Sequence, residues 1–378
     1  MSDYLTENKE RNKKGEFDKT DVLSVSGDYG IVNQIELLGR SFAGASVLPY
    51  HVVRHGNIVY TKSPLKEYPY GIVKANTDVD GIVSTLYAVY NIKNNVDAQF
   101  IEYYFSLANR TNRYFKPIVR IGAKHDMKIG NQEVLANKVT FPNLEEQTKI
   151  ASLFRFLDER IATQNKIIED LKMLKSAIIE NVFDDKHSER LQLDNVGSYI
   201  RGLTYSSNDV VEHGGTLVMR SNNIVNGSLL DYNNNVVFVN KQMSAEQQLQ
   251  NGDIVICMAN GSSSLVGKSS FYDGNCHSPI TVGAFCGIYR SKEPIVKWLF
   301  QTNKYRRYIW NSLQGGNGAI ANLNGEDILN MSFSIPNAPI KDTCVKMLTS
   351  VDSALGNNMS LCALYTLQKQ HLLRQMFI

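Results

Sequence analysis

The residues of this sequence with the most specific chemistry are arginines and asparagines in polar loops. Arg220-Ser-Asn-Asn223 follows a run typical of a β-strand, and Asn260 opens a second polar loop that extends to Ser264. In the major groove of DNA, arginine can donate two hydrogen bonds to guanine, and asparagine can pair twice with adenine. Taken as a set, these residues favour double-stranded DNA as a ligand, with about a third of them expected to touch it. For each residue taken singly, an ordinary solvated surface position is the alternative.

The candidate DNA-contacting residues are polar or basic side chains in or beside expected turns. They are Arg40, Lys62, Arg120, Lys124, Lys128, Arg201, Arg220, Asn222, Asn223, Asn260, Ser262, Ser263, Lys268 and Asn317. Some of them lie in two loops, 120–124 and 314–318, that hold corresponding places in the two halves of the chain. Such loops are candidates for entering a DNA groove, and an ordinary connection is the alternative.

Motifs for enzymatic chemistry are missing or misspaced. Gly261 to Ser269 looks like a phosphate-binding loop, but five residues separate Gly261 from Gly267 where that motif has four. Its backbone N–H groups and Lys268 can still meet a DNA phosphate, and a mere surface turn is the alternative. Neither Asn-Pro nor Asp-Pro occurs, so the tetrapeptide of adenine methyltransferases is absent. We predict a chain with no catalytic residues and no cofactor of its own.

The cysteines predict neither a metal site nor a disulfide framework. Cys257, Cys276 and Cys286 lie near His277, but their spacing matches no zinc motif. We expect three buried thiols on strands instead. The five cysteines are odd in number, and no apolar signal peptide or membrane span is present. Together these features predict a cytoplasmic protein.

The chain repeats itself with an offset of 194 residues. Phe141-Pro142-Asn143 opens a helix-like stretch that ends near Phe183, and Ile335-Pro336-Asn337 opens a second that ends at Phe377. Asp158 falls on Asp352 and Lys175 on Lys369 without a gap. A repeat this long is too large for a solenoid unit. It predicts two copies of a globular domain followed by a long helix.

Both stretches carry apolar residues at helical spacing, so each predicts an amphipathic helix of roughly 60 Å. Asn143 is the expected N-cap, with Glu146 three residues later. We expect the helices to pair antiparallel as a coiled coil, and two separate helices on two cores are the alternative. The expected helix-pairing residues are Leu153, Leu157, Ile161, Ile168, Leu171, Ile178, Val351, Leu355, Met359, Cys362 and Leu372.

The segments before the helices predict mixed, β-rich domains whose sequences are similar to each other. Expected strands are Asp21–Ser26, Asn57–Tyr60, Ile82–Tyr90, Thr216–Arg220, Asn235–Val239, Asp253–Cys257 and Gly283–Tyr289. Subtracting the offset from Leu191–Gly197 gives positions before residue 1, so we expect the first domain to be shorter at its start. The net charge of +3 is small, so any DNA grip must come from local patches, with a partner supplying much of it.

The stretch from Phe141 to Ile150, with its Pro142, Glu145-Glu146-Gln147 and later Asp158, resembles the central conserved region of type I restriction–modification specificity subunits. The second copy keeps Pro336, Asp352 and Phe377 but replaces Glu-Glu-Gln by Ile340-Lys341-Asp342. The resemblance covers essentially the whole chain. It implies an α+β fold with two target-recognition domains joined by two long antiparallel helices in pseudo-two-fold symmetry.

The resemblance also implies a division of the chain and a function. The expected segments are 1–141 and 187–335 as recognition domains, and 142–186 and 336–378 as helical regions. Each recognition domain would read half of a bipartite DNA site, and the helices would set the spacing. Two modification subunits carrying S-adenosylmethionine would dock on the chain, and two restriction subunits can join. A stand-alone DNA methyltransferase or nuclease with degenerate motifs is the alternative.

Overall fold

The computed structural model describes residues 1–65, 67–121, 127–184, 189–313 and 321–377. The chain forms two compact units, here called unit 1 (Met1–Asn165 with Ser360–Ile378) and unit 2 (Lys166–Met359). Each unit therefore combines one β-rich segment with half of each long helix. The four segments expected along the sequence are thus distributed over two units. The boundary between the units falls near the middle of each long helix.

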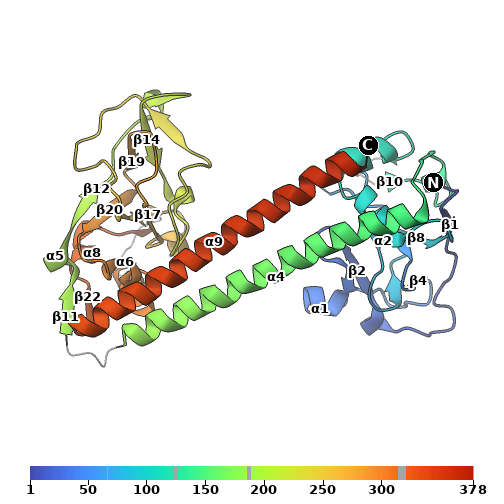
Figure 1. Cartoon of the computed structure of the whole chain (residues 1–378), viewed down its shortest axis with the longest axis horizontal. Helices are drawn as coiled ribbons and strands as arrows, with labels where there is room; N and C mark the ends of the chain where they lie inside the picture. The colour runs from blue at the N-terminus through green and yellow to red at the C-terminus, as the bar shows by residue number, and fades with distance from the viewer. Residues whose placement is uncertain (66, 122–126, 185–188, 314–320, 378) are drawn as a thin grey trace. The chain divides into compact units, whose positions relative to one another are not determined.

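In unit 1, short strands and helices come before the first long helix, and Figure 1 labels several of them. They are β1 (Leu5–Glu7), β2 (Leu23–Ser26), β3 (Gly30–Asn33), α1 (Gln34–Leu38), β4 (His51–Val53), β5 (Ile58–Thr61), β6 (Val73–Ala75), β7 (Gly81–Val83), β8 (Tyr87–Ile92), α2 (Ala98–Tyr104), α3 (Ala108–Phe115), β9 (Arg120–Ile121) and β10 (Met127–Lys128). The long helix α4 (Leu144–Val182) follows them and continues into unit 2.

Unit 2 has more short elements after α4. They are β11 (Glu189–Gln192), α5 (Leu193–Val196), β12 (Gly197–Arg201), β13 (Val210–Val211), β14 (Thr216–Met219), β15 (Val237–Val239), β16 (Ile254–Cys257), β17 (Ala259–Asn260), β18 (Ser269–Phe271), β19 (Ile280–Val282), β20 (Cys286–Ser291), α6 (Val296–Leu299), α7 (Asn303–Leu313), β21 (Ala321–Asn322), α8 (Gly325–Leu329) and β22 (Ser332–Ile335). The second long helix, α9 (Ala338–Met376), starts here and ends in unit 1.

Each unit has its own central four-stranded antiparallel sheet, and the two sheets have equivalent strand orders. The order is β1-β8-β5-β6 in unit 1 and β12-β20-β16-β18 in unit 2. The central strands β5 and β16 are buried along their whole length, as expected for apolar strands with a layer on each face. The sequence similarity between the two β-rich segments therefore reflects a repeated sheet. The strands around that sheet differ between the two copies.

The strands largely follow the sequence prediction, but two of the predicted runs contain a turn. The run Gly283–Tyr289 starts with a turn that the hydrogen bond from Cys286 N–H to the carbonyl of Gly283 closes, and β20 begins only at Cys286. The run Ile82–Tyr90 is not a single strand, because a turn over Ser84–Tyr87 separates β7 from β8. The hydrogen bond from Tyr87 N–H to the carbonyl of Ser84 closes this turn. An unbroken β-rich pattern does not reveal such a turn, because none of its residues is a glycine or proline.

The two long helices begin where the sequence predicts. The side chain of Asn143 accepts a hydrogen bond from the N–H of Glu146 at 2.9 Å, which caps α4. Pro339 lies in the first turn of α9, where its missing N–H has no partner to lose. Gly356 does not interrupt α9, and Asn358 donates to the carbonyl of Ala354 at 2.7 Å within the helix.

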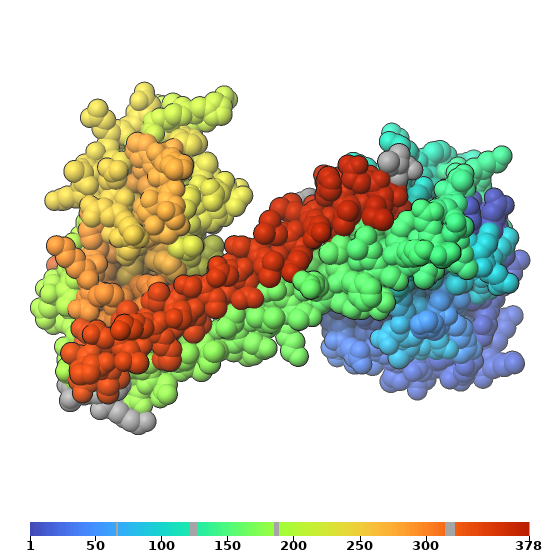
Figure 2. All heavy atoms as spheres, viewed as in Figure 1, coloured from blue at the N-terminus to red at the C-terminus, as the bar shows by residue number. Residues whose placement is uncertain are grey.

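In unit 1 the start of α4 packs against the end of α9. The rings of Phe154 and Phe377 lie 5.8 Å apart, and Lys369 pairs with the carboxylate of Asp158. Further along, Arg160 donates to the hydroxyl of Tyr365 at 2.7 Å. In these pairs the residue numbers rise along α4 while they fall along α9, so the two helices are antiparallel. Figure 2 shows that their side chains meet at the surface.

Unit 2 repeats this arrangement with the helices exchanged. Asp352 on α9 pairs with Lys175 of α4 at 2.7 Å and with Lys297 at 3.0 Å. The indole N–H of Trp298 also donates to Asp352 at 3.2 Å. Asp158 and Asp352, like Lys369 and Lys175, are related by the 194-residue offset. The pseudo-symmetry therefore extends to individual ion pairs.

The expected helix-pairing residues separate into three groups. Leu157, Ile168 and Leu355 are buried, while Ile161, Leu171, Ile178, Val351, Cys362 and Leu372 are half-buried. Leu153 and Met359 are exposed, so their assignment to the pairing face was wrong. Helical spacing gives a wide apolar stripe, and only the packing decides which edge of that stripe is covered.

Candidate nucleic-acid interface

In unit 2 the two polar loops predicted to read DNA lie next to each other. The side chain of Asn260 donates to the hydroxyl of Ser221 at 3.3 Å, although 39 residues separate them. Arg220 and Asn222 beside this contact are exposed. We call Arg220, Ser221, Asn222 and Asn260 the unit 2 polar cluster. It places a cation and several amide groups on one surface.

Asn223 has a different role from its neighbours. Its side chain is 1% exposed, accepts from the N–H of Arg220 at 2.9 Å and donates to the carbonyls of Asp231 and Asn234. These bonds fix the turn that carries Arg220 and Asn222. We therefore do not retain Asn223 as a DNA contact, because its burial removes it from the surface.

The loop that looked like a phosphate-binding motif forms a short turn beside the polar cluster. Ser262 N–H donates to the side chain of Asn260 at 3.0 Å, and Ser262 and Ser263 are exposed. Gly267 closes the loop with a positive φ of 81° and lies against Ile309 of α7. Lys268 is half-buried. This loop is thus an anchored extension of the cluster, and no helix follows it as a phosphate-binding loop requires.

Two further candidates of unit 2 lie at strand ends. Arg201 is exposed at the last residue of β12, and its carbonyl accepts from Gln247 at 3.1 Å. Asn317 and the glycine-rich segment 314–318 lie outside the described residues. The strand after them, β21, pairs with β17 and brings Ala321 opposite Asn260. Strand β21 therefore adjoins the polar cluster.

In unit 1 the basic candidates have different environments. Arg120 and Lys128 are exposed and face each other across the β9–β10 pair. Like charges directly opposite each other on a sheet repel, so an external anion would stabilise this pair. Lys124, in the connection between them, lies outside the described residues. Arg40 is exposed, and its guanidinium lies 4.5 Å from the ring centre of Phe42.

Lys62 is already engaged inside unit 1. It is half-buried, it donates to the side chain of Asn131, and burial lowers the pKa of its amine. The carbonyl of Asn131 in turn accepts from the hydroxyl of Tyr90. Lys62 thus ties β5 to the segment that precedes α4, which makes it a weaker candidate for DNA than Arg120 or Lys128.

Two exposed apolar side chains escaped the sequence analysis. Leu86 lies on the turn between β7 and β8 and is 66% exposed, and Phe285 lies on the turn between β19 and β20 and is 69% exposed. The carbonyl of Phe285 accepts from the N–H groups of Met258 and Ala259, beside Asn260. The turns hold equivalent positions in the repeated sheet. Aligning TLYAVY with AFCGIY already pairs these residues, but only the structure reveals their exposure.

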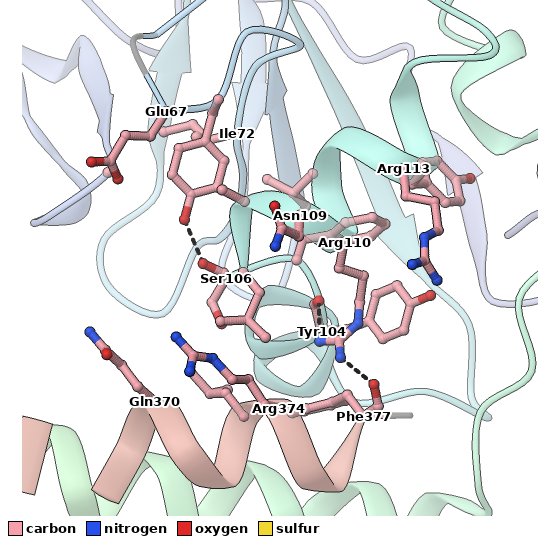
Figure 3. Close-up of a pocket in the computed structure, with 18 of the residues that line it drawn as sticks. Glu67, Ile72, Tyr104, Ser106, Asn109, Arg110, Arg113, Gln370, Arg374 and Phe377 are labelled. Atoms are coloured by element: carbon pink, nitrogen blue, oxygen red, sulfur yellow. Dashed lines mark hydrogen bonds between the residues drawn. The ribbon is translucent and has the colours of Figure 1, made fainter. Parts of the chain in front are cut away.

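Unit 1 also contains a basic pocket of about 1340 Å³. Asn109, Arg110 and Arg113 line it from α3, and Gln370 and Arg374 from α9 (Figure 3). Arg110 is fixed, since it donates to the carbonyls of Tyr104 and Phe377. Arg113 and Arg374 line the pocket, and so do the carboxylates of Asp28, Glu67 and Asp158. The lining therefore holds more basic than acidic side chains, and both kinds are present.

The described residues hold no group of three histidines, cysteines or acids that could bind a metal ion. All five cysteines are free thiols, and Cys257 lies directly opposite Cys286 across β16 and β20. Cys257 and Cys286 are buried as expected, and burial raises the pKa of the Cys286 thiol to about 12. Cys276 is only half-buried and lies outside a strand. Within the described part of the chain, no helix is long and apolar enough to cross a membrane.

The fold of two repeated β-rich units and two long helices also occurs in a solved S subunit of a type I restriction–modification system. The S subunit of the type I system from M. genitalium superposes with a TM-score of 0.59 at 13% identity, over 99% of this chain and 94% of that one. At this identity the likeness establishes the fold alone. The mixed α+β fold expected from the sequence is thereby confirmed.

Two curated proteins align with part of the sequence. The specificity subunit of the type I restriction enzyme EcoKI from Escherichia coli (strain K12) is 35% identical over 155 residues, which cover 38% of this chain and 31% of that protein. The StySPI specificity subunit from Salmonella potsdam is 34% identical over 153 residues, with the same coverage. The chain thus matches about a third of the length of these relatives. No family model matches it.

Proposed function

We propose that this chain is the DNA-specificity subunit of a type I restriction–modification complex. The observation that carries the proposal is the repetition of one recognition unit, in the fold of the S subunit from M. genitalium. The two copies keep the central sheet and differ in their loops, as expected for readers of two different sequences. Each unit would then read one half of a bipartite site.

In unit 2 the reading surface would be the unit 2 polar cluster with Phe285 at its edge. Arg220 and Asn222 supply donors for base edges, while the Ser262–Ser263 turn and Lys268 can meet phosphates. In unit 1 the corresponding surface would be the β9–β10 pair and the turn at Leu86. Arg120 and Lys128 supply the positive charge there, and DNA phosphates relieve their repulsion.

Docking of two modification subunits is supported by a second feature of the helices. Six exposed apolar residues, here called the matched residues, obey the 194-residue offset: Leu153, Ile167 and Met173 on α4, and Met347, Leu361 and Leu367 on α9. Their exposures also match, for example 63% for Met173 and 61% for Leu367. Equivalent exposed apolar residues in the two units suit two copies of one partner.

Catalysis and the cofactor would then belong to the partners. The modification subunits would carry S-adenosylmethionine and methylate adenine in each half-site, two restriction subunits can join, and the complex would act in the cytoplasm. The chain itself would contribute sequence selection and the spacing between the half-sites, through its long helices. Its role is therefore that of a non-catalytic scaffold that reads DNA.

The test is to co-express the chain with the modification subunit encoded beside it and to map N6-methyladenine across the host genome by long-read sequencing. We expect one bipartite motif that disappears when residues 142–183 are deleted. A matched control replaces Arg220 by alanine, which should relax only one half of the motif. Methylation by the chain without its partner would favour the stand-alone enzyme, and a stable complex that methylates no motif would contradict the proposal.

A further inference from the structure

Each unit displays one apolar side chain at the tip of a turn, outside the core of that unit. Leu86 is 66% exposed and Phe285 is 69% exposed. The valines that end the preceding strands, Val83 of β7 and Val282 of β19, are 0% exposed. The core of each unit is thus closed before its turn begins, and Leu86 and Phe285 contribute little to it.

The two turns have the same geometry. The hydrogen bond from Cys286 N–H to the carbonyl of Gly283 closes the turn of unit 2 at 2.8 Å, and the equivalent bond across Ser84–Tyr87 closes that of unit 1 at 3.0 Å. Leu86 and Phe285 are each the third residue of a four-residue turn. Each turn leads into an equivalent strand of the central sheet, β8 or β20. The repeat therefore places the two apolar side chains at the same point of the two units.

The tip of each turn is held by its backbone. The carbonyl of Phe285 accepts from the N–H of Met258 at 2.9 Å and from the N–H of Ala259 at 3.1 Å. The next residue, Asn260, belongs to the unit 2 polar cluster, so Phe285 lies beside that cluster. The N–H of Leu86 donates to the hydroxyl at the first position of its own turn at 3.3 Å. A side chain on a fixed backbone loses little conformational freedom when it inserts into a ligand.

The segments around these side chains are polar and carry no negative charge. Segments 220–223 and 260–268, beside Phe285, contain no aspartate or glutamate, and neither does the turn 84–87 that carries Leu86. Their exposed side chains are mostly hydroxyl, amide or guanidinium groups. A protein partner usually covers a contiguous apolar patch. A single apolar side chain among polar groups instead suits DNA, where the apolar faces of the bases lie between two phosphate backbones.

Methylation of adenine within a duplex includes a step that such side chains fit. DNA methyltransferases turn the target base out of the stack, because its reactive atom cannot be reached inside the duplex. This extrusion is costly, and it leaves a gap between the apolar faces of two neighbouring base pairs. Leucine and phenylalanine are among the side chains that proteins insert between base steps.

We propose that Leu86 and Phe285 are wedges that insert into the DNA base stack, one in each half-site, and fill the space left by the target adenine. This inference rests on the proposed function, which supplies the DNA and the methylation reaction. The wedge would stabilise the gap while the modification subunit holds the extruded base. The chain would thus lower the cost of base extrusion as well as select the sequence, and each unit would act on its own half-site.

The fluorescence of 2-aminopurine tests this role, because it rises when the base leaves the stack. The whole chain is purified with the modification subunit and mixed with duplexes that carry the mapped bipartite motif, with 2-aminopurine in place of the target adenine of one half-site. Phe285→Ala should lower the ratio of extruded to stacked base by about tenfold in one half-site, and Leu86→Ala in the other. Phe285→Leu, which gives unit 2 the side chain of unit 1, should retain most of the signal.

A duplex that lacks the base opposite the target adenine provides a second readout, because extrusion then breaks no base pair. On this duplex both alanine variants should methylate within about twofold of the unaltered complex, since extrusion is easier there. Arg220→Ala removes a proposed base contact, so its defect should persist. The matched control Tyr29→Ala removes a side chain that is also 69% exposed, on the turn between β2 and β3, and should leave both half-sites unchanged. Circular dichroism checks that all variants are folded.

Each outcome decides the proposal. Reduced extrusion in one half-site, with rescue by the duplex that lacks the opposite base, supports the wedge. Unchanged extrusion, equal loss in both half-sites, a defect without rescue, or loss of the modification subunit from either alanine variant overturns the wedge and leaves the proposed function standing. If the unaltered complex methylates no motif, the proposed function fails, and this inference fails with it.

Discussion

The repeated ion pairs allow one measurement to separate the effect of burial from that of geometry. Asp352 and Lys175 in unit 2 are 13% and 10% exposed at their side chains, whereas Asp158 and Lys369 in unit 1 are 41% and 23% exposed. Both pairs join α4 to α9 at equivalent positions. Removing the lysine by Lys175→Met or Lys369→Met therefore changes the same interaction in two solvent environments.

The expected costs differ because a buried carboxylate loses its hydration. Breaking a buried pair typically costs about 3–5 kcal/mol, and because Asp352 keeps Lys297 as a partner we expect about 2 kcal/mol for Lys175→Met. Exposed pairs are worth about 0–1 kcal/mol, so Lys369→Met should cost less than about 1 kcal/mol. Asp158 also retains the hydroxyl of Tyr103 at 2.9 Å.

Urea unfolding measures these costs in one chain. The two tryptophans, Trp298 and Trp310, both belong to unit 2, so their fluorescence follows that unit, while far-ultraviolet circular dichroism follows both. With a slope of about 2 kcal/mol per M, Lys175→Met should lower the fluorescence midpoint by about 1 M. The control Lys172→Met removes an exposed pair with Glu169 and should shift it little. Equal destabilisation by Lys175→Met and Lys369→Met would refute the reasoning.

Three other predictions use separate features of the chain. Phe285→Ala and Leu86→Ala should each slow methylation of a different half-site by about tenfold without loss of folding. The rates are measured on oligonucleotides that are already methylated in one half-site. Equal effects of one variant on both half-sites would contradict separate reading. Gly267→Ala places a Cβ 2.7 Å from Ile309 at a φ of 81° and should cost about 1–3 kcal/mol by tryptophan-detected unfolding, more than Gly214→Ala, whose Cβ meets no atom within 4 Å. Burial, together with nearby Arg11 and Lys62, lowers the pKa of His51 to about 4 against an opposing effect of Glu7. The unfolded chain then binds the proton first as pH falls, so unit 1 should lose up to about 1.4 kcal/mol per pH unit between about pH 6.5 and 4. An NMR titration of His51 gives the midpoint, and His51→Gln should flatten the dependence of stability on pH.

Periodicity and repetition in the sequence predict the frame of this fold. Apolar residues at helical spacing and the Asn143 cap define α4 within one residue of its observed end, because these signals are local. The same spacing does not distinguish Leu153, which is exposed, from Leu157, which is buried. That choice depends on which side of the helix meets Phe377 and its neighbours, and this contact joins residues more than 200 positions apart.

The candidate interface was predictable only in part. The polar type of Arg220 and Asn223 is plain from the sequence, yet one is exposed and the other fixes the turn. The contact of Asn260 with Ser221 depends on sheet topology, which the sequence does not specify. Leu86 and Phe285 look like core residues, because an apolar type at the end of a strand run usually signals burial. Their exposure arises from the turns that follow β7 and β19.

The matched residues have a consequence for the life of the chain in the cell. An isolated polypeptide that displays Met173, Leu367 and their four companions to water is prone to self-association and to recognition by chaperones and proteases. Under the proposed function, its abundance should follow the supply of the modification subunit that would cover these residues. Excess chain would then be cleared quickly, which would keep uncoupled DNA readers from occupying genomic sites that no methyl group marks.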